Sequence, residues 1–488
     1  MIRAHAGARP DADALIQDGV RLNYAELDDL MDRIAAALQR EGVRPTESIA
    51  ICASTSIEYA ALFVGALRAG VAVAPIAPSS TPEQIVGMVA DSGAKRFFLD
   101  AEVEAAISGQ PHDPATPRTA FEAFEAWIEP EGAVPAPVDI QPEWPFNIIY
   151  SSGTTGTPKG IVQSHGMRFQ HVNRAEASGY GPGTVSLLST PLYSNTTLVS
   201  FFPTLAAGGA VLLMKKFDAK RYLELAQAYK VTHTMLVPVQ YSRMLALPEF
   251  DAADLSSFRM KFCTSAPFGA ALKTDILRRW PGGLVEYFGM TEGGGSCVLV
   301  AHEWPDKLHT VGRPIPGHDI RLIDEEGREV PTGEIGEIVG ASAAMMNGYH
   351  NQPGKTDDAT WVSPGGTRYI RTGDVGRFDE DGFLTLMDRK KDMIISGGFN
   401  IYPSDLEAVM RGHPDVADVA VVGVHSADWG ETPVAFVVSK GADAAAIKAW
   451  TNERLGKTQR LSDVRLLDEL PRSHIGKVLK RDLRDGYA

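Results

Sequence analysis

The most informative stretch of the sequence is Tyr150-Ser151-Ser152-Gly153-Thr154-Thr155-Gly156-Thr157-Pro158-Lys159-Gly160. It follows an apolar run, residues 146–150, that is typical of a buried strand. Glycines let backbone amides approach an anion closely, and hydroxyls and a lysine can donate to phosphate oxygens. The stretch lacks the Gly-Lys-Ser/Thr ending of the Walker loop, which disfavours a kinase-like P-loop NTPase. On these residues alone, a phosphate-binding loop and a flexible Ser/Thr/Gly linker both stay open.

Helical and strand patterns alternate on both sides of this loop. Asn23 and Glu26 form a capping-box pattern in front of an amphipathic helix that Gly42 can end. A succession of strand, helix and strand predicts a parallel sheet with crossover helices. A connection rich in Pro, Ala and Glu, residues 109–142, is expected to lie on the surface. The expected strands are 48–52, 71–75, 211–214, 234–237 and 260–263, and the expected helices are 57–70 and 218–229.

The pattern changes after about residue 310. Short apolar runs are separated by Glu-Glu-Gly, Pro-Thr-Gly and Asp-Glu-Asp-Gly, which is typical of turns between antiparallel strands. The last hundred or so residues have a pattern of their own, which is enough for a small α+β domain. Its expected helices are 403–412 and 444–455, and its expected strands are 416–424, 433–439 and 463–467.

Composition excludes several classes of protein. The chain has 488 residues, more than one hydrophobic core usually organises, so at least two domains are expected. Acidic residues outnumber basic ones 61 to 47, which disfavours general binding to nucleic acid or to anionic membranes. The three cysteines are too far apart for a disulfide scaffold or a cysteine-based zinc site. There is no apolar run of about 20 residues and no apolar signal-peptide core, so we expect a soluble, cytoplasmic protein.

Five further motifs follow the loop, and together the six occur in the order found in one enzyme family. The sequence therefore resembles the adenylate-forming enzymes over nearly its whole length. These comprise acyl-CoA synthetases, adenylation domains of peptide synthetases and firefly-type luciferases, and the resemblance is strongest to acyl- or aryl-CoA ligases. The five motifs are Thr264-Ser265-Ala266-Pro267, Tyr287-Phe288-Gly289-Met290-Thr291-Glu292, Arg371-Thr372-Gly373-Asp374, Asp388-Arg389-Lys390-Lys391-Asp392 and Pro471-Arg472-Ser473-His474-Ile475-Gly476-Lys477.

The resemblance implies an α/β fold in two domains. A large N-terminal domain, residues 1–387, would contain parallel and mixed sheets with helices and a small β-barrel-like part. A small, mobile α+β C-terminal domain, residues 388–488, would carry the adenylation lysine.

An ATP site follows from the same resemblance. Thr154, Thr155 and Lys159 would hold the β- and γ-phosphates within the loop Ser151, Ser152, Gly153, Thr154, Thr155, Gly156, Thr157 and Lys159. One face of adenine would contact Ser265, Ala266 and Pro267. Its other side would face Tyr287 and Phe288, with Glu286 and Gly289 also in the nucleotide-binding set.

The catalytic residues implied by the resemblance are Thr291, Glu292 and Lys477. Thr291 would bind the α-phosphate, Glu292 would coordinate Mg²⁺, and Lys477 would stabilise the charge that builds during adenylation. Asp374 would accept the two ribose hydroxyls, and Arg389 would add a donor there. Plainer interpretations also stay open: a helix cap with a solvated acid for Thr291 and Glu292, a turn aspartate, and a solvated surface lysine.

A second set of residues is implied for thioester formation after rotation of the small domain. Lys391 would be the hinge, and Gly397, Gly398 and Phe399 would line a tunnel for the pantetheine arm of CoA. Trp429 would face the same tunnel, although packing in the core is an equally good interpretation of a tryptophan.

The acyl pocket is the least determined part of the sequence. Many acyl- and aryl-CoA ligases have histidine where this chain has Ser194, and Tyr287 stands where many have glycine or leucine. Arg243 could meet a second carboxylate, but an outward-facing helical arginine is the plainer interpretation. The candidate pocket residues are Tyr193, Ser194, Asn195, Thr196, Gln240, Phe262, Gly289, Gly293, Gly294 and Gly295.

The sequence thus predicts an ATP-dependent carboxylate–CoA ligase that forms acyl-AMP and pyrophosphate and then acyl-CoA and AMP. The expected ligands are a carboxylic acid, ATP, Mg²⁺ and coenzyme A, with no nucleic acid and no integral membrane association; a homodimer is left open. Two alternatives remain: a freestanding adenylation enzyme that loads a carrier-protein pantetheine, and a luciferase-like oxygenase. The acid itself stays open among aryl, phenylpropanoid, aliphatic and dicarboxylic acids.

Overall fold

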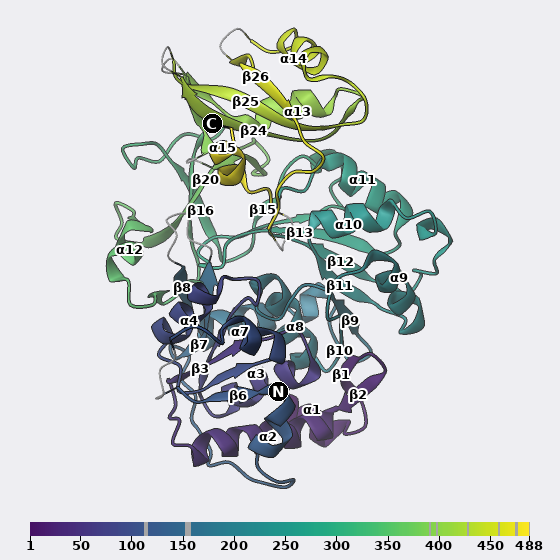
Figure 1. Ribbon diagram of the computed structural model, residues 1–488, viewed down its shortest axis with the longest axis vertical. Helices are drawn as coiled ribbons and strands as arrows, with labels where there is room; N and C mark the ends of the chain where they lie inside the picture. Colours follow the sequence, from purple (N-terminus) through teal and green to yellow (C-terminus); the bar gives the residue numbers. More distant parts are fainter. Residues whose placement is uncertain are drawn as a thin grey trace. The chain divides into compact units, whose positions relative to one another are not determined.

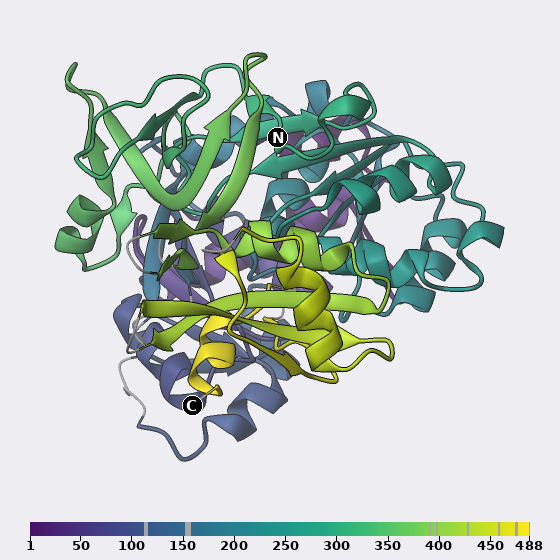
Figure 2. The same cartoon turned by 90° about the horizontal axis from the view of Figure 1, so that it is seen from above.

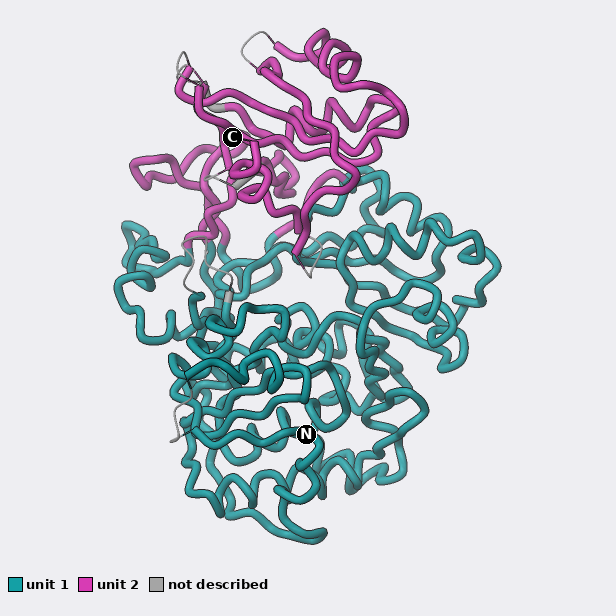
Figure 3. The backbone as a smooth tube through the Cα atoms, in the orientation of Figure 1, with its two compact units in different colours: residues 1–308, 314–319, 340–370 teal, residues 309–313, 320–339, 371–488 magenta. Residues whose placement is uncertain are grey.

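Strands and helices alternate along most of the chain in the computed structural model (Figure 1). The structure describes residues 1–111, 116–151, 158–389, 392–396, 399–426, 429–456, 459–473 and 477–487. Unit 1 comprises residues 1–308, 314–319 and 340–370, and unit 2 comprises residues 309–313, 320–339 and 371–488 (Figure 3). The assignment of residues 388–488 to a separate mobile domain stays a prediction.

The first sheet of unit 1 is mostly parallel, as the sequence predicts. Its order includes β14-β13-β12-β11-β9-β10-β1-β2, and each pair from β13 to β1 is parallel. The crossover helices are α8 (Asn195–Ala206), α9 (Ala219–Ala228), α10 (Pro238–Leu245) and α11 (Ala270–Arg279). The strands are β1 (Asp13–Gln17), β2 (Val20–Asn23), β9 (Val185–Leu188), β10 (Ala210–Leu213), β11 (His233–Leu236), β12 (Met260–Cys263), β13 (Gly283–Phe288) and β14 (Cys297–Val300).

The second sheet of unit 1 contains the strand in front of the signature loop. Its order is β18-β8-β7-β4-β3-β5-β6, and β7 and β8 form an antiparallel hairpin in which Ser151 opposes Lys159. Its helices are α3 (Ile57–Arg68), α4 (Pro82–Asp91), α5 (Ala101–Ala106) and α7 (His165–Asn173). The strands are β3 (Ser48–Cys52), β4 (Ala72–Pro75), β5 (Phe97–Leu99), β6 (Arg118–Ala120), β7 (Pro145–Ser151), β8 (Lys159–Ser164) and β18 (Gly348–Tyr349).

The predicted capping box begins α2 (Tyr24–Arg40). The Asn23 side chain accepts from the Glu26 amide, and the Glu26 carboxylate accepts from the Asn23 amide. One hydrophobic core joins elements of both sheets. At its centre the Phe63 ring of α3 contacts the rings of Phe146 in β7 and Phe202 in α8.

The expectation of a surface connection over residues 109–142 is partly wrong. This segment contains β6, a 3-10 turn η1 (Phe121–Ala123) and α6 (Phe124–Trp127). Phe124 and Trp127 are buried, and the Trp127 ring lies 4.7 Å from that of Phe98. The Pro, Ala and Glu content suggested exposure, but aromatic residues three positions apart supply a buried face.

Unit 2 contains the strands expected after residue 310. Left-handed glycines at positions 327, 333 and 382 lie in the predicted turns. These strands, most of whose residues belong to unit 2, are β16 (Asp319–Ile323), β17 (Gly336–Ala341), β20 (Arg368–Phe378) and β21 (Leu384–Arg389). Within unit 1, β19 (Thr360–Val362) pairs antiparallel with the first residues of β20 and follows α12 (Pro353–Asp358).

The end of unit 2 forms the predicted α+β arrangement (Figure 2). Its sheet has the order β23-β22-β25-β24, and β26 pairs parallel with β25. Leu406, Met410 and Ile447 pack its helices on buried strand residues. The strands are β22 (Ile394–Ser396), β23 (Phe399–Ile401), β24 (Val416–Ser426), β25 (Gly430–Ser439) and β26 (Asp463–Leu466), and the helices are α13 (Pro403–Arg411), α14 (Ala444–Asn452) and α15 (Lys480–Asp485).

The remaining elements are short. They are α1 (Ile2–Ala8), η2 (Glu176–Ser178), η3 (Phe250–Ala252), η4 (Pro305–Lys307) and β15 (Arg313–Pro314). Among the described residues, every helix is too short or too polar to cross a membrane.

Candidate active site

Two of the predicted motifs leave neighbouring parallel strands at the same edge of the first sheet. Cys263, the last residue of β12, lies opposite Glu286 of β13. The Thr264 hydroxyl donates to the carbonyl oxygen of Tyr287 at 2.9 Å, which ties the two motifs together. The carboxyl ends of parallel strands are where ligands bind in open α/β sheets. The motifs at 264–267 and 287–292 therefore share one candidate site.

Ser265 has a backbone that is unusual for its residue type. Its φ is +79°, in the left-handed region that favours glycine. Its hydroxyl lies 2.6 Å from that of Thr196, a predicted acyl-pocket residue on α8. Such conformations cost about 1–3 kcal/mol and cluster at functional sites. The strain at Ser265 agrees with a role at the ligand.

Tyr349 contacts both Lys159, the first residue of β8 in the β7–β8 hairpin, and Glu292, the predicted metal ligand. The Lys159 ammonium lies 4.9 Å from the centre of the Tyr349 ring, which is a cation–π contact. The Tyr349 hydroxyl donates to Glu292 Oε1 at 2.9 Å. Burial raises the pKa of the Tyr349 phenol, and the Glu292 carboxylate raises it further, so the hydroxyl keeps its proton. Residues 152–157 of the predicted loop lie outside the described residues.

Sequence reasoning missed Tyr349. It lies in β18, which pairs with β8 so that Tyr349 opposes Ile161 two residues after Lys159. No motif includes it, and its position depends on a strand pairing almost two hundred residues apart in the chain. The sequence offers no short-range signal for such a pairing.

Glu292 suits a magnesium ion that arrives with ATP. Mg²⁺ keeps several waters and is usually held by one or two carboxylates and by substrate phosphates. Among the described residues there is no group of three or more His, Cys, Asp or Glu residues that could form a complete metal cage. The neighbouring Thr291 is fixed through its carbonyl oxygen, which accepts from Gln163 Nε2 at 2.7 Å.

The Glu286 side chain serves packing. It forms a buried ion pair with Lys273 of α11, and Lys273 also donates to the Leu308 carbonyl at 2.8 Å. Burial raises the pKa of Glu286 to about 7, and Lys273 opposes that rise. Successive side chains of a strand point to opposite faces, so Glu286 and Tyr287 diverge. A nucleotide contact by Glu286 stays a prediction.

Aromatic rings fill one side of the predicted acyl pocket. Phe262 is buried, and its ring lies 5.7 Å from that of Tyr180 and 6.0 Å from that of Tyr287. The Gln240 amide caps its own helix, accepting from the Val237 amide and donating to Ser189. Arg243 is exposed, which agrees with the interpretation of this residue as an outward-facing helical arginine.

Neighbouring backbone leaves no room for side chains at Gly293 and Gly294. Gly293 and Gly294 have φ of +74° and +87°. A Cβ at either position would collide with a backbone carbonyl oxygen, that of Ala344 or of Gly340. At Gly289 a Cβ would lie 2.7 Å from Ser296 Oγ. The protein itself occupies the space beside Gly293 and Gly294, and their place in the acyl pocket stays a prediction.

The remaining pocket residues surround the start of α8. Ser194 is the N-cap of this helix and forms no side-chain cap bond. The side-chain oxygen Oδ1 of Asn195 accepts from Arg168 Nη2 at 3.0 Å. Burial raises the pKa of Tyr193, while a bond with Ser79 lowers it. A small side chain, that of Ser194, therefore stands at the start of this helix.

In unit 2 the two predicted ribose residues lie opposite each other. Asp374 of β20 pairs with Arg389 of β21 next to an irregularity in the ladder, and the preceding Gly373 has φ of +69°. The carbonyl oxygen of Lys477 accepts from the Ser473 amide at 2.8 Å. The roles of these residues in nucleotide binding stay predictions.

The strands that flank the predicted thiol-tunnel residues pair with each other in the C-terminal sheet. Ser396, the last residue of β22, opposes Gly430 of β25, which directly follows Trp429. Trp429 is 61% exposed, so the interpretation of this residue as core packing is wrong. Lys391, Gly397 and Gly398 lie outside the described residues, and Phe399 is placed by its backbone in β23.

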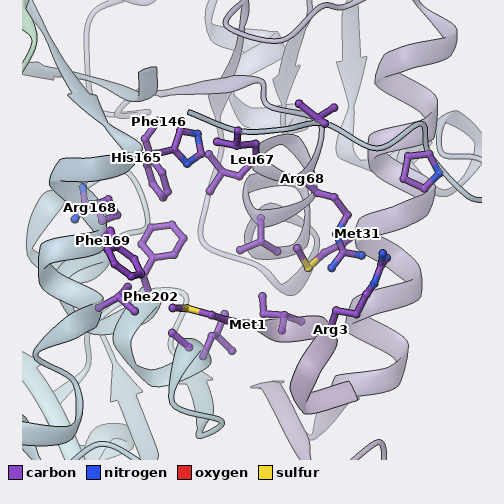
Figure 4. Close-up of a pocket in the computed structure, with 18 of the residues that line it drawn as sticks. Met1, Arg3, Met31, Leu67, Arg68, Phe146, His165, Arg168, Phe169 and Phe202 are labelled. Carbon is purple, nitrogen blue, oxygen red and sulfur yellow. The ribbon is translucent and has the colours of Figure 1, made fainter. Parts of the chain in front are cut away.

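An apolar cavity of about 850 Å³ lies elsewhere in unit 1, and none of the predicted site residues line it. Phe146, His165, Phe169 and Phe202 form one side, and Arg3, Met31 and Arg68 form the other (Figure 4). One face of α7 borders this cavity through Phe169 and Val172. Arg168 of the same helix also lines the cavity, with its guanidinium over the rings of Phe146 and Phe202, and it donates to the predicted pocket residue Asn195.

Comparison with known families decides the assignment. A model described as AMP-binding enzyme matches residues 2–350, and one described as AMP-binding enzyme C-terminal domain matches residues 405–477. The chain belongs to the AMP-binding enzyme family. The predicted membership in the adenylate-forming superfamily is thereby confirmed.

Individual members of the AMP-binding family match along nearly the full chain. Indoleacetate–CoA ligase of Aromatoleum aromaticum is 33% identical over 505 residues, covering 99% of this chain and 96% of the relative. Fatty acid–[acyl-carrier-protein] ligase of Streptomyces coeruleorubidus is 31% identical over 497 residues, covering 99% and 95%. The structure of ATP-bound MatB from Rhodopseudomonas palustris superimposes with a TM-score of 0.88 at 28% identity, covering 100% and 99%. The predicted α/β fold class is confirmed.

Proposed function

We propose that this protein is an ATP-dependent carboxylate–CoA ligase. The observation that carries the proposal is the meeting of Lys159 and Glu292 at Tyr349, next to Thr291 in the signature motif. A cation for the outer phosphates and a carboxylate for a phosphate-bound Mg²⁺ are what the loss of pyrophosphate from ATP requires. Membership in the AMP-binding family supports the same reaction.

The first step joins the acid to AMP. A carboxylate oxygen of the acid attacks the α-phosphorus, the bond to the bridging oxygen of pyrophosphate breaks, and acyl-AMP forms. Lys159 neutralises the leaving pyrophosphate, and Thr291 holds the α-phosphate. Lys477 stabilises the negative charge that builds between the two reactants. Asp374 and Arg389 hold the ribose.

The second step transfers the acyl group to a thiol. The sulfur of CoA attacks the acyl carbon, AMP leaves, and the thiol proton is released. We propose that Trp429 and the segment 397–399 accept the pantetheine arm, with Lys391 as the hinge between the two steps. The exposure of Trp429 and its position beside Ser396 support this assignment.

A carrier-protein pantetheine is the second candidate acceptor. One matched relative is named a fatty acid–[acyl-carrier-protein] ligase, whereas another is named a CoA ligase. Both acceptors present the same thiol arm. The chemistry at the adenylate is therefore the same, and only the recognition of the remainder of the acceptor differs. We further propose that Mg²⁺ is the ATP-bound cation, that the protein forms a homodimer and that it is located in the cytoplasm.

A product balance tests the proposal. The protein is incubated with ATP, Mg²⁺ and a panel of aliphatic, aryl, phenylpropanoid and dicarboxylic acids, with CoA, with a phosphopantetheinyl carrier protein, or without a thiol. We expect AMP, pyrophosphate and acyl-CoA in equal amounts with free CoA. Thioester formation with the carrier protein alone would support the second candidate. Oxygen consumption with light emission would support the luciferase-like alternative.

A further inference from the structure

One face of α7 presents a row of basic groups to the interior of unit 1. Arg168 and His171 are three residues apart, and Arg174 follows at the C-terminal cap of the helix. Arg168 is 2% exposed, and Arg174 is half-buried. Burial lowers the pKa of Arg168 to about 9 and that of His171 to about 3. Charged side chains in proteins are almost never fully buried unless they are paired with a group of opposite charge.

These groups have no acidic partner in the described part of the chain. Arg168 Nη2 donates to neutral amide oxygens, those of Asn147 at 3.2 Å, Asn195 at 3.0 Å and Gln163. Arg174 Nη2 lies 2.6 Å from His318 Nε2, again a neutral group. No carboxylate is among the charges that act on Arg168, His171 or Arg174. Buried positive charge without a counter-ion is costly, so the face is suited to an anion that the protein does not supply.

Several polar atoms of this face are also without a hydrogen-bond partner among the described residues. Arg168 Nε and Nη1 and His171 Nδ1 are buried and have no partner among the described residues. Most buried polar side-chain atoms in proteins are hydrogen-bonded, so unused ones call for an explanation. A ligand at this face, or an ordered water held by it, would satisfy part of the set.

The same face borders the predicted acyl pocket at three points. Arg168 holds Asn195, and the Met167 methyl group lies 2.8 Å from where a Cβ of Gly293 would be. His318, the neighbour of Arg174, accepts from the Ser296 amide at 2.9 Å, just after the glycine run. Arg174 also lies close enough to Tyr287 to oppose the rise in the pKa of that phenol.

We propose that the acid activated by this protein carries a second anionic group, a second carboxylate, and that Arg174 binds it. This inference rests on the proposed function and narrows its substrate to dicarboxylic acids. Arg174 is the contact because it is the least buried of the arginines on this face and retains guanidinium donors that a carboxylate can accept in pairs. Arg168 and His171 precede it on α7 and add no negative charge to the region.

The inference predicts selectivity between matched acids. We would compare hexanoate with adipate, and 3-phenylpropanoate with 3-(4-carboxyphenyl)propanoate, by kcat/KM for pyrophosphate release. The diacid of each pair should be preferred by the wild type. In Arg174→Met the kcat/KM for the diacid should fall by about tenfold to a hundredfold, the range expected for a lost hydrogen bond to a charged group. The kcat/KM for the monoacid should change by about threefold or less.

Two further variants and one binding measurement make the test decisive. Arg174→Lys should recover part of the diacid preference, and Arg243→Met, which removes an exposed arginine of α10, should leave it unchanged. Calorimetric titration with adipate and hexanoate reads the same preference without turnover. If the wild type binds diacids better but releases no pyrophosphate, the proposed function fails, while the assignment of Arg174 as the site of the second carboxylate stands.

Three outcomes would overturn the inference. The first is equal loss for the monoacid and the diacid in Arg174→Met, and the second is a wild-type preference for the monoacid in both pairs. The third is a rise in the KM for ATP with every acid in Arg174→Met, because Arg174 would then bind a phosphate of the nucleotide.

Discussion

At the scale of single residues, Tyr349 explains how Lys159 of the β7–β8 hairpin and Glu292, the carboxylate proposed to bind Mg²⁺, are held together. Its ring supports Lys159, and its hydroxyl orients Glu292, so one side chain positions two charges of opposite sign. A cation–π contact and a hydrogen bond to a carboxylate each fix geometry with little added charge. Lys159 and Glu292, which the motifs predicted, are therefore both positioned by Tyr349, which no motif contains.

Tyr349→Phe separates these two contacts. The ring under Lys159 is kept, but Glu292 loses its donor, and a hydrogen bond to a charged group contributes about 1.5–3 kcal/mol. We expect pyrophosphate release at limiting Mg²⁺ to fall by about tenfold and to recover at saturating Mg²⁺. The measurement is the initial rate across a Mg²⁺ titration at fixed ATP and acid.

Tyr150→Phe is the matched control. It removes a similar bond, from the Tyr150 hydroxyl to Asp91 Oδ2 at 2.7 Å, on the strand that precedes the same loop. Its Mg²⁺ dependence should stay that of the wild type. If both variants shift equally, or neither does, Tyr349 does not orient a metal ligand.

At the scale of elements, the buried pair Lys273–Glu286 joins α11 to β13, the strand that leads into the signature motif. Removing one partner leaves the other charge buried, which costs about 3–5 kcal/mol, whereas replacing both by apolar groups costs much less. We expect Glu286→Leu to lower the free energy of unfolding strongly and the double variant Lys273→Met with Glu286→Leu to recover most of it. Denaturant unfolding of the two single variants and the double variant measures this coupling.

Additive losses in this cycle would contradict the assignment of a structural pair. A normal KM for ATP in the folded double variant would further separate the Glu286 side chain from nucleotide binding. A raised KM with full stability would instead support the nucleotide contact predicted from the sequence.

Local elements were predictable because their signals are local. The strand at Ser48–Cys52 and the helix begun by Asn23 have the predicted bounds or start, since hydrophobic periodicity and caps act over a few residues. The position of Ser265 beside Thr196 follows from motifs placed at one sheet edge. Tyr349 and the basic face of α7 depend on contacts distant in sequence. Gly293 and Gly294 suggested open space, yet the backbone of residues 340–344 fills it.

At the scale of the whole molecule, buried histidines link stability to pH. Burial lowers the pKa of His165, His233 and His318 to about 4, and that of His171 to about 3. In the unfolded chain each histidine has a pKa of about 6.5. The unfolded state therefore takes up protons first as the pH falls. The stability they contribute is full above about pH 6.5 and is lost progressively toward pH 4.

We expect the contribution of these histidines to the free energy of unfolding to be nearly independent of pH above pH 7 and to fall below pH 6.5. His233 is fully buried, so His233→Gln should reduce the slope between pH 6 and 5 by about 1.4 kcal/mol per pH unit. His425, which is exposed on β24, supplies the control His425→Gln with an unchanged slope. Denaturant unfolding at fixed ionic strength measures both, and equal slopes in all three proteins would contradict the assignment.

The chain divides its predicted chemistry between its two units. Lys159, Thr291 and Glu292 belong to unit 1, whereas Asp374, Arg389 and Lys477 belong to unit 2. In the proposed mechanism adenylation uses groups from both sets, whereas attack of a thiol on a finished acyl-adenylate needs no lysine at the α-phosphate. The two half-reactions should therefore respond differently to the loss of Lys477.

The most direct test of the two-step account is rapid-quench measurement of the two half-reactions in Lys477→Ala. Adenylation from acid and ATP should slow by about a hundredfold or more, a typical loss for one electrostatic group. Conversion of supplied acyl-adenylate to acyl-CoA should stay near the wild-type rate. Equal loss of both steps, or full adenylation activity in the variant, would contradict the account.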